Sequence, residues 1–142
     1  MDAQIDYKQL LMAIGDGVVV ADAEGKIVFW NPGAERIFGF SESEAAGQTL
    51  DLIVPERQRD RHWEGFDKTM QTGQTRYGNE LLRVPALHKE GHPLSIAFTV
   101  AMLHAADGKV SAIVAIVRDE TKRWDEERAL RGRVKELEAN VP

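Results

Sequence analysis

The feature that most constrains the fold is a run of three extended segments in the second half of the chain, joined by two short turns. We expect strands over about Asn79–His88, Pro93–Leu103 and Val110–Arg118, with turns at Glu90–Gly91 and Ala106–Gly108. Strands joined by such short turns pair antiparallel, because a parallel pair needs a crossover of a dozen residues or more. The chain must therefore build an antiparallel sheet.

A second pair of strands is expected near the N-terminus, at Val18–Val20 and Ile27–Trp30. The loop between them, Asp22–Gly25, ends in a glycine, which accepts the positive φ that tight hairpins require. In the middle strand of the later three, larger and smaller side chains alternate, which predicts one face against a core or pocket. The larger ones are Ile96, Phe98, Val100 and Met102.

Three helices are expected between the hairpin and the later strands. The first, over 31–39, begins with an Asn-Pro pair that suits an N-cap and a first helical position. The second, over 41–47, carries the Ser-x-x-Glu pattern of a capping box. The third, over 55–73, begins with proline and ends with glycine, which favours a helix between them.

Helices are also expected at both ends, dividing the chain into a cap helix (1–15), a core (16–120) and a charged C-terminal helix (121–142). The cap helix has Tyr7, Leu10, Leu11 and Ile14 at helical spacing and should stop at Gly15. The order of elements indicates an α+β fold, a five-stranded antiparallel sheet with helices on one face.

The C-terminal helix has an apolar stripe with the spacing of coiled-coil core positions. The stripe is only two heptads long, too short for a stable coiled coil by itself. It either extends a dimer or packs on the sheet of its own chain. Its residues are Leu130, Val134, Leu137 and Val141.

Composition excludes several classes of function. The 142 residues include no cysteine, which removes disulfides, thiolate metal sites and cysteine nucleophiles. The net charge of -5 argues against a direct nucleic-acid or membrane partner. No phosphate-binding loop or catalytic motif is present, so we do not expect an enzyme. With no signal peptide or apolar run of membrane-spanning length, we expect a cytoplasmic protein.

Four short motifs occur in a characteristic order over roughly residues 10–122. They are Asn31-Pro32-x-Ala34-x-x-x-Phe38-Gly39-Phe40, then Glu42, Glu44 and Gly47, then Lys89-Glu90-Gly91, and finally Val117-Arg118-Asp119-Glu120-Thr121. Together they resemble the signature of the PAS family. The resemblance implies a PAS fold acting as a sensory module in signal transduction or transcriptional regulation. The last strand is followed by only about twenty residues, so we expect output to a signalling protein on another chain.

The absence of cysteine also excludes the photoadduct of flavin-binding PAS domains and the cysteine-anchored chromophore of photoactive yellow protein. A b-type haem needs only an axial ligand, usually histidine where no cysteine exists. Three histidines, His88, His92 and His104, fall at strand ends and turns, where we expect them to be exposed. His62 instead lies on the long helix, at the edge of an apolar face with Trp63, Phe66 and Met70. Such a position suits a haem ligand, and it equally suits a core histidine with a satisfied hydrogen bond.

The helix that carries His62 resembles that of oxygen-sensing haem PAS domains, such as those of the rhizobial kinase FixL and the DOS phosphodiesterase. The resemblance implies that His62 ligates haem iron in a sensor of a diatomic gas or of redox state, with Arg59 and Arg61 close enough for the haem propionates. Two positions differ, because Leu82 stands where FixL has its distal arginine and Glu80 where the DOS protein has its distal methionine. The expected haem-pocket residues are His62, Phe66, Met70, Leu82, Phe98 and Val100.

An apolar distal pocket offers no hydrogen bond to iron-bound oxygen, so carbon monoxide, nitric oxide or a redox change would suit it better. The alternative is a PAS module that is empty or holds a small apolar ligand and acts by dimerisation and protein–protein contact. In either case the family resemblance implies a homodimer that uses the N- and C-terminal helices.

Overall fold

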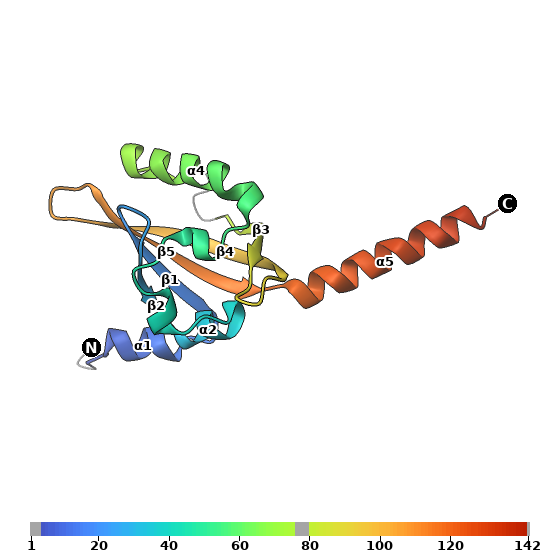
Figure 1. Ribbon diagram of the computed structural model, residues 1–142, viewed down its shortest axis with the longest axis horizontal. Helices are drawn as coiled ribbons and strands as arrows, with labels where there is room; N and C mark the ends of the chain where they lie inside the picture. Colours follow the sequence, from blue (N-terminus) through green and yellow to red (C-terminus); the bar gives the residue numbers. More distant parts are fainter. Residues whose placement is uncertain (1–3, 76–79, 142) are drawn as a thin grey trace.

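The computed structural model describes residues 4–75 and 80–141. Its strands form one five-stranded antiparallel sheet, as expected, and their order is β2-β1-β5-β4-β3 (Figure 1). The hairpin strands β1 and β2 therefore lie at one edge, and the last strand, β5, pairs with β1 in the middle of the sheet. The strands are β1 (Gly17–Asp22), β2 (Ile27–Trp30), β3 (Leu82–Leu87), β4 (Pro93–His104) and β5 (Val110–Asp119).

Five α-helices and two short 3-10 helices complete the described structure. The expected third helix is divided, because a 3-10 turn, η2 (Glu56–Gln58), precedes the α-helix proper. The helices are α1 (Tyr7–Ala13), α2 (Pro32–Phe38), α3 (Glu42–Ala45), η1 (Leu50–Leu52), α4 (Arg59–Thr72) and α5 (Thr121–Ala139).

The short helices α2 and α3 begin and end where their capping residues require. Asn31 caps α2 by accepting a hydrogen bond from Ala34 N, and Gly39 ends it with a left-handed backbone at φ 85°. For α3, Ser41 and Glu44 form both bonds of the capping box. These local signals were all predicted and are confirmed.

Asn31 also ties α1 to the core. It is 1% exposed, and its Oδ1 accepts a second hydrogen bond from Val18 N at 2.7 Å. Its Nδ2 lies within hydrogen-bond distance of the carbonyl oxygens of Leu11, Ile14 and Asp16, at 3.0, 3.3 and 3.0 Å. The side chain thus lies within hydrogen-bond distance of five backbone groups from three segments.

The core lies between the sheet and the layer formed by α2, α3 and η1. Trp30 and Phe38 are its largest members, with ring centroids 5.4 Å apart, and Trp30 Nε1 donates to the carbonyl of Phe40 at 3.0 Å. The indole is thereby buried without leaving its N–H unpaired. The other buried members of this cluster are Val19, Ile27, Ala34, Ala45, Ala86, Leu94, Ile96 and Val117.

The start of β3 and the end of α1 also differ from the prediction. β3 begins at Leu82, paired with Phe98, and beyond that point β4 pairs only with β5. Glu80 and Leu81 precede the strand, and the expected start at Asn79 lies outside the described residues. α1 ends at Ala13, before Gly15, because Ile14 is already extended and its carbonyl turns towards Asn31.

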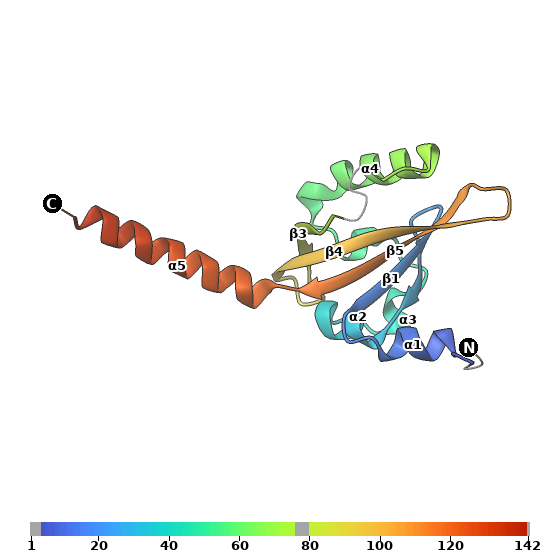
Figure 2. The same cartoon turned by 180° about the vertical axis from the view of Figure 1, so that it is seen from behind.

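The C-terminal helix α5 projects away from the sheet, as Figures 1 and 2 show from opposite sides. Its base is fixed to β4, since Glu120 N donates to Ser95 O at 2.8 Å and Ser95 N donates to Thr121 Oγ1 at 3.0 Å. The apolar stripe does not pack on the sheet. Its residues Leu130, Val134, Leu137 and Val141 are 60, 46, 68 and 71% exposed.

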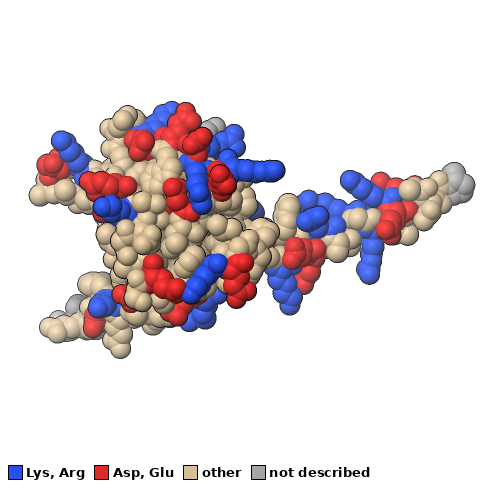
Figure 3. All heavy atoms as spheres, in the orientation of Figure 1, with Lys and Arg blue, Asp and Glu red and all other residues tan. Residues whose placement is uncertain are grey.

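Charged side chains of both signs are interspersed over the face shown in Figure 3, including α5, as the mixed charge of the sequence predicts. Among the described residues, no helix has the length and apolar character needed to cross a membrane.

Candidate functional site

The candidate site is built around one face of α4. The covered face of this helix carries His62, Trp63, Phe66 and Met70, spaced so that they fall on one side. Phe66 is buried, and the other three are half-buried. The His62 ring meets Trp63 edge-on, with centroids 4.9 Å apart, and lies 6.2 Å from the ring of Phe66. The structure therefore groups His62 with apolar and aromatic neighbours, as the sequence predicted.

Trp63 and Arg59 attach the first part of α4 to the segments before it. Trp63 Nε1 donates to Asp51 Oδ1 at 2.7 Å, and its ring covers Gly25, where an added Cβ would lie 2.3 Å from the indole. Arg59 donates to the carbonyls of Val54 and Asp51 at 3.1 and 3.4 Å. Of the two arginines suggested for the haem propionates, Arg59 is therefore already engaged in holding a turn, and Arg61 is exposed.

His62 has an unpaired ring nitrogen in a half-buried setting. Its Nδ1 is buried and has no hydrogen-bond partner in the described structure. Burial lowers the pKa of His62, and the charge of Asp51 offsets this only in part. The imidazole is therefore neutral at pH 7, and a neutral imidazole has a lone pair for iron.

The strand residues of the predicted pocket share the inner face of the sheet, which α2 and α3 also cover. Leu82 lies directly opposite Phe98 across β3 and β4, and Val100 lies opposite Ala115 across β4 and β5. All of them are half-buried, whereas Ile96 and Val117 on the same face are almost fully buried. The inner face thus has a closely packed part below α2 and a less covered part towards the C-terminal end of β4 and the N-terminal end of β5.

Two residues of this less covered part, Ile113 and Ala115, were missed by the sequence reasoning, and Met102 was placed on the inner face but left out of the predicted pocket. Met102 lies opposite Ile113, and Ala115 is opposite Val100, so all three share the inner face with the predicted residues. The alternation in β4 contained the signal for Met102. Ile113 and Ala115 could be placed only once the register of β4 and β5 was known, since β5 is apolar on both faces.

The predicted pocket has two parts, the α4 residues around His62 and the strand residues Leu82, Phe98 and Val100. Within the described residues, no hydrogen bond or ring contact links His62 to Leu82, Phe98 or Val100. In Figures 1 and 2, α4 lies on the side of β3 and β4, away from α1 and α2.

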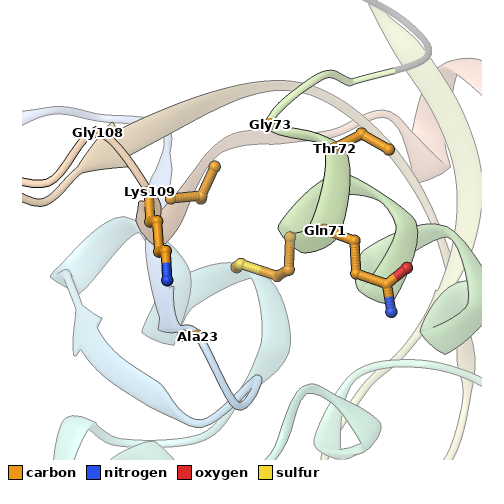
Figure 4. A pocket seen from close by; sticks show the side chains of 8 residues that line it. Ala23, Gln71, Thr72, Gly73, Gly108 and Lys109 are labelled. Atoms are coloured by element: carbon orange, nitrogen blue, oxygen red, sulfur yellow. The ribbon is translucent and has the colours of Figure 1, made fainter.

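A cleft of about 470 Å³ opens at the C-terminal end of α4. Gln71 extends from the helix and Lys109 from the β4–β5 turn on the opposite wall (Figure 4). Met70 lines this cleft, and His62 does not. The cleft therefore lies two helical turns from the His62 imidazole. Of the predicted pocket residues, only Met70 both lines the cleft and shares the helix face of His62.

The remaining histidines differ from expectation in one case. His92 and His104 are exposed, as predicted. His88 is half-buried, because its ring lies against Gly39, the residue that ends α2. No sequence pattern indicated this contact, since the two residues are far apart along the chain.

Comparison with known proteins identifies the family. Residues 5–119 match the family described as PAS fold, so the chain belongs to the PAS family. This match includes α1 and all five strands and leaves α5 outside. The predicted fold and the predicted family are both confirmed.

The curated relatives include sensor proteins. The chain is 36% identical over 116 residues, 81% of its length, to an uncharacterised protein of Azorhizobium caulinodans. It is 42% identical over 55 residues, 39% of its length, to the sensor protein FixL of Bradyrhizobium diazoefficiens. To the oxygen sensor protein DosP of Escherichia coli it is 27% identical over 103 residues, 72% of its length. The chain spans only 16, 11 and 13% of these three relatives.

Solved structures show the same fold. The PAS domain of a Colwellia psychrerythraea protein superposes with a TM-score of 0.71 at 23% identity, covering 82% of this chain and 95% of that one. A sensory box histidine kinase/response regulator from Burkholderia thailandensis gives a TM-score of 0.65 at 16% identity, covering 94 and 98%. The chain is thus a PAS domain of the kind found in sensor proteins.

Proposed function

We propose that this PAS domain binds b-type haem through His62 and responds to a diatomic gas or to the redox state of the iron. The observation that carries the proposal is the state of His62, whose buried Nδ1 has no partner and whose lowered pKa keeps the ring neutral. A buried polar atom without a partner costs stability, so its presence calls for an explanation such as a missing ligand.

The apolar residues on α4 and on the sheet support the proposal. Phe66 and Met70 extend the apolar side of α4, and the half-buried inner face of the sheet offers Leu82, Phe98 and Val100. A porphyrin needs such apolar walls, while the protein tunes the iron through its axial ligand and the polarity of the opposite side. FixL and DosP, two relatives of this chain, are described as a sensor protein and an oxygen sensor protein.

The residues proposed for the distal side of the haem favour particular gas ligands. Leu82 has no hydrogen-bond donor, and Glu80, just before β3, is exposed. Bound oxygen is stabilised by a donor in the distal pocket, and Leu82 supplies none, which favours carbon monoxide, nitric oxide or a plain change of oxidation state. Haem itself would supply the redox and gas-binding chemistry, and the chain's residues would hold it and exclude water.

Absorbance spectroscopy of the whole chain mixed with hemin tests the proposal. We expect a Soret band that saturates at one hemin per chain and that is lost or strongly altered in His62→Ala. His104→Ala is the matched control, because this exposed histidine lies at the far end of β4, and it should leave the spectrum unchanged. A wild-type chain that stays free of hemin, or a His62→Ala spectrum identical to wild type, contradicts the proposal.

The exposed stripe of α5 favours a second candidate function, a dimerising PAS module whose core is empty or holds a small apolar molecule. Four apolar side chains, Leu130, Val134, Leu137 and Val141, face solvent on a helix that touches the sheet only at its base. Exposed apolar residues at coiled-coil spacing are stabilised when a second helix covers them. A homodimer through this stripe is compatible with a haem-binding core and with a core that is empty or holds a small apolar molecule.

A further inference from the structure

The β3–β4 turn, His88–His92, holds three metal-binding side chains in a fixed backbone. His88 N donates to His92 O at 3.1 Å, and Gly91 N donates to His88 O at 2.8 Å, which closes the turn. Gly91 has φ 89°, a left-handed conformation that glycine adopts without strain. The positions of the two histidines relative to each other are therefore set by the turn itself.

The turn is also fastened to the helical layer. Lys89 N donates to Phe38 O at 2.8 Å, and Lys89 Nζ forms an ion pair with Glu44 at 2.6 Å. The hydrogen bond from Lys89, with further help from Ser41, lowers the pKa of Glu44 to about 2, so the pair stays charged near neutral pH. This pairing directs the lysine charge towards α3 and leaves Glu90 as the charged neighbour of the two imidazoles.

Gly39 provides a niche for the ring of His88. A Cβ at this position would lie 2.6 Å from Cε1 and 2.7 Å from Nε2 of His88, so only glycine leaves room for the imidazole. Gly39 also ends α2 with positive φ, and both requirements favour the same residue. The ring of His88 is thus held by packing, which reduces the entropy lost when it binds a ligand.

The side chains of His88, Glu90 and His92 offer ligand atoms that all lie within 4.8 Å of one another. The two imidazole rings stack with centroids 4.2 Å apart and an angle of 16° between their planes. Glu90 N donates to His88 Nδ1 at 3.1 Å, so Nδ1 carries the lone pair and Nε2, beside Gly39, carries the proton. The lone pair of His88 therefore points towards the backbone N–H of Glu90, from which it accepts this bond.

We propose that this turn binds one divalent transition-metal ion of the zinc class through His88, Glu90 and His92. Two imidazoles and one carboxylate suit zinc, whereas magnesium and calcium prefer oxygen ligands throughout. Three protein ligands leave the fourth tetrahedral position for water or for a group from a partner. Binding replaces one exposed hydrogen bond, from Glu90 N to His88 Nδ1, and brings the two stacked rings to a common ion.

Calorimetric titration of the chelator-treated chain with zinc chloride tests the proposal. We expect one zinc ion per chain, no binding of magnesium chloride, and an affinity that falls by about tenfold or more in His92→Gln, since even outer-shell changes at metal sites cost about 10–100-fold. His92 is exposed, so this variant should keep the fold, which circular dichroism verifies. His104→Gln is the matched control and should bind zinc as wild type does.

Two further measurements separate this site from the rest of the molecule. His62→Ala should retain zinc binding, because His62 lies on α4 and not in the turn. In NMR spectra, zinc should shift the ring signals of His88 and His92 and leave those of His104 in place. Absence of zinc binding to the wild-type chain, or equal binding by the folded His92→Gln variant, overturns the proposal.

Discussion

Asn31 satisfies more backbone groups than any other side chain for which hydrogen bonds are described. Its two side-chain atoms serve two N–H groups and three carbonyls, and the residue is almost completely buried. The Asn-Pro motif thus does more than start a helix. It also connects the first helix, the first strand and α2 at a single point.

We expect Asn31→Ala to lower the free energy of unfolding by about 3 kcal/mol, because the buried N–H groups of Val18 and Ala34 lose their acceptor at roughly 1–3 kcal/mol each. Urea denaturation measures the change. Asn140→Ala, at the exposed end of α5, is the control and should change it by less than about 0.5 kcal/mol. Equal effects of the two substitutions would contradict the role assigned to Asn31.

His62 should make the stability of the apo chain depend on pH. Its pKa in the folded state lies below the ordinary value of 6.5, so the unfolded chain binds the proton more readily. The free energy of unfolding should therefore fall as the pH drops below 6.5 and level off below the folded pKa, with a slope of at most about 1.4 kcal/mol per pH unit. Urea denaturation at several pH values measures this, and only the difference between wild type and His62→Leu is assigned to His62. A difference that does not vary with pH would be inconsistent with the burial of this ring.

At the scale of the elements, two glycines in helices differ in whether their neighbours require a glycine. In α2, a Cβ on Gly33 would lie 2.1 Å from the carbonyl oxygen of Asp16, a contact with backbone that cannot move easily. In α4, nothing lies within 4 Å of a Cβ added to Gly65. Gly33 is thus required by close packing between α2 and the segment before β1, and Gly65 is not required by any neighbour.

We expect Gly33→Ala to destabilise the fold by about 1–3 kcal/mol, as over-packing does, and Gly65→Ala to stabilise it by up to about 1 kcal/mol through helix propensity. Thermal unfolding followed by circular dichroism compares the two, each serving as the other's control. A Gly33→Ala variant as stable as wild type would show that the two segments can separate at little cost.

The predictable elements were those specified by neighbouring residues. The caps at Asn31, Ser41 and Gly39, and the turn glycines, require only local geometry, and the structure confirms them. The start of β3, the direction of α5 and the burial of His88 against Gly39 depend on contacts between distant segments. For the same reason His62 could be placed on a covered helix face, but the register that brings Ile113 and Ala115 to the inner face could not be predicted.

At the scale of the whole molecule, α5 leaves the domain with its apolar stripe uncovered, and this bears on the number of chains in solution. We expect the full chain to dimerise and a chain truncated after Glu120 to show a smaller dimer fraction by light scattering. Val134→Glu should act like the truncation, because it places a charge in the stripe.

Lys135→Glu is the matched control, since it changes the charge of the same helix at a position outside the stripe. It should leave the dimer fraction unchanged. Identical masses for the full chain, the truncated chain and Val134→Glu would show that the stripe does not mediate self-association.

The two hydrogen bonds that join Ser95 to Glu120 and Thr121 fix the base of α5 to the first part of β4, so a movement of that part would tilt the whole helix. The helix has 19 residues and is therefore roughly 28 Å long. Over that length, a tilt of about 10° at the base would carry the far end sideways by roughly 5 Å. A small tilt at the base would thus move the far end by about half of the ~8–10 Å that separates the axes of two packed helices.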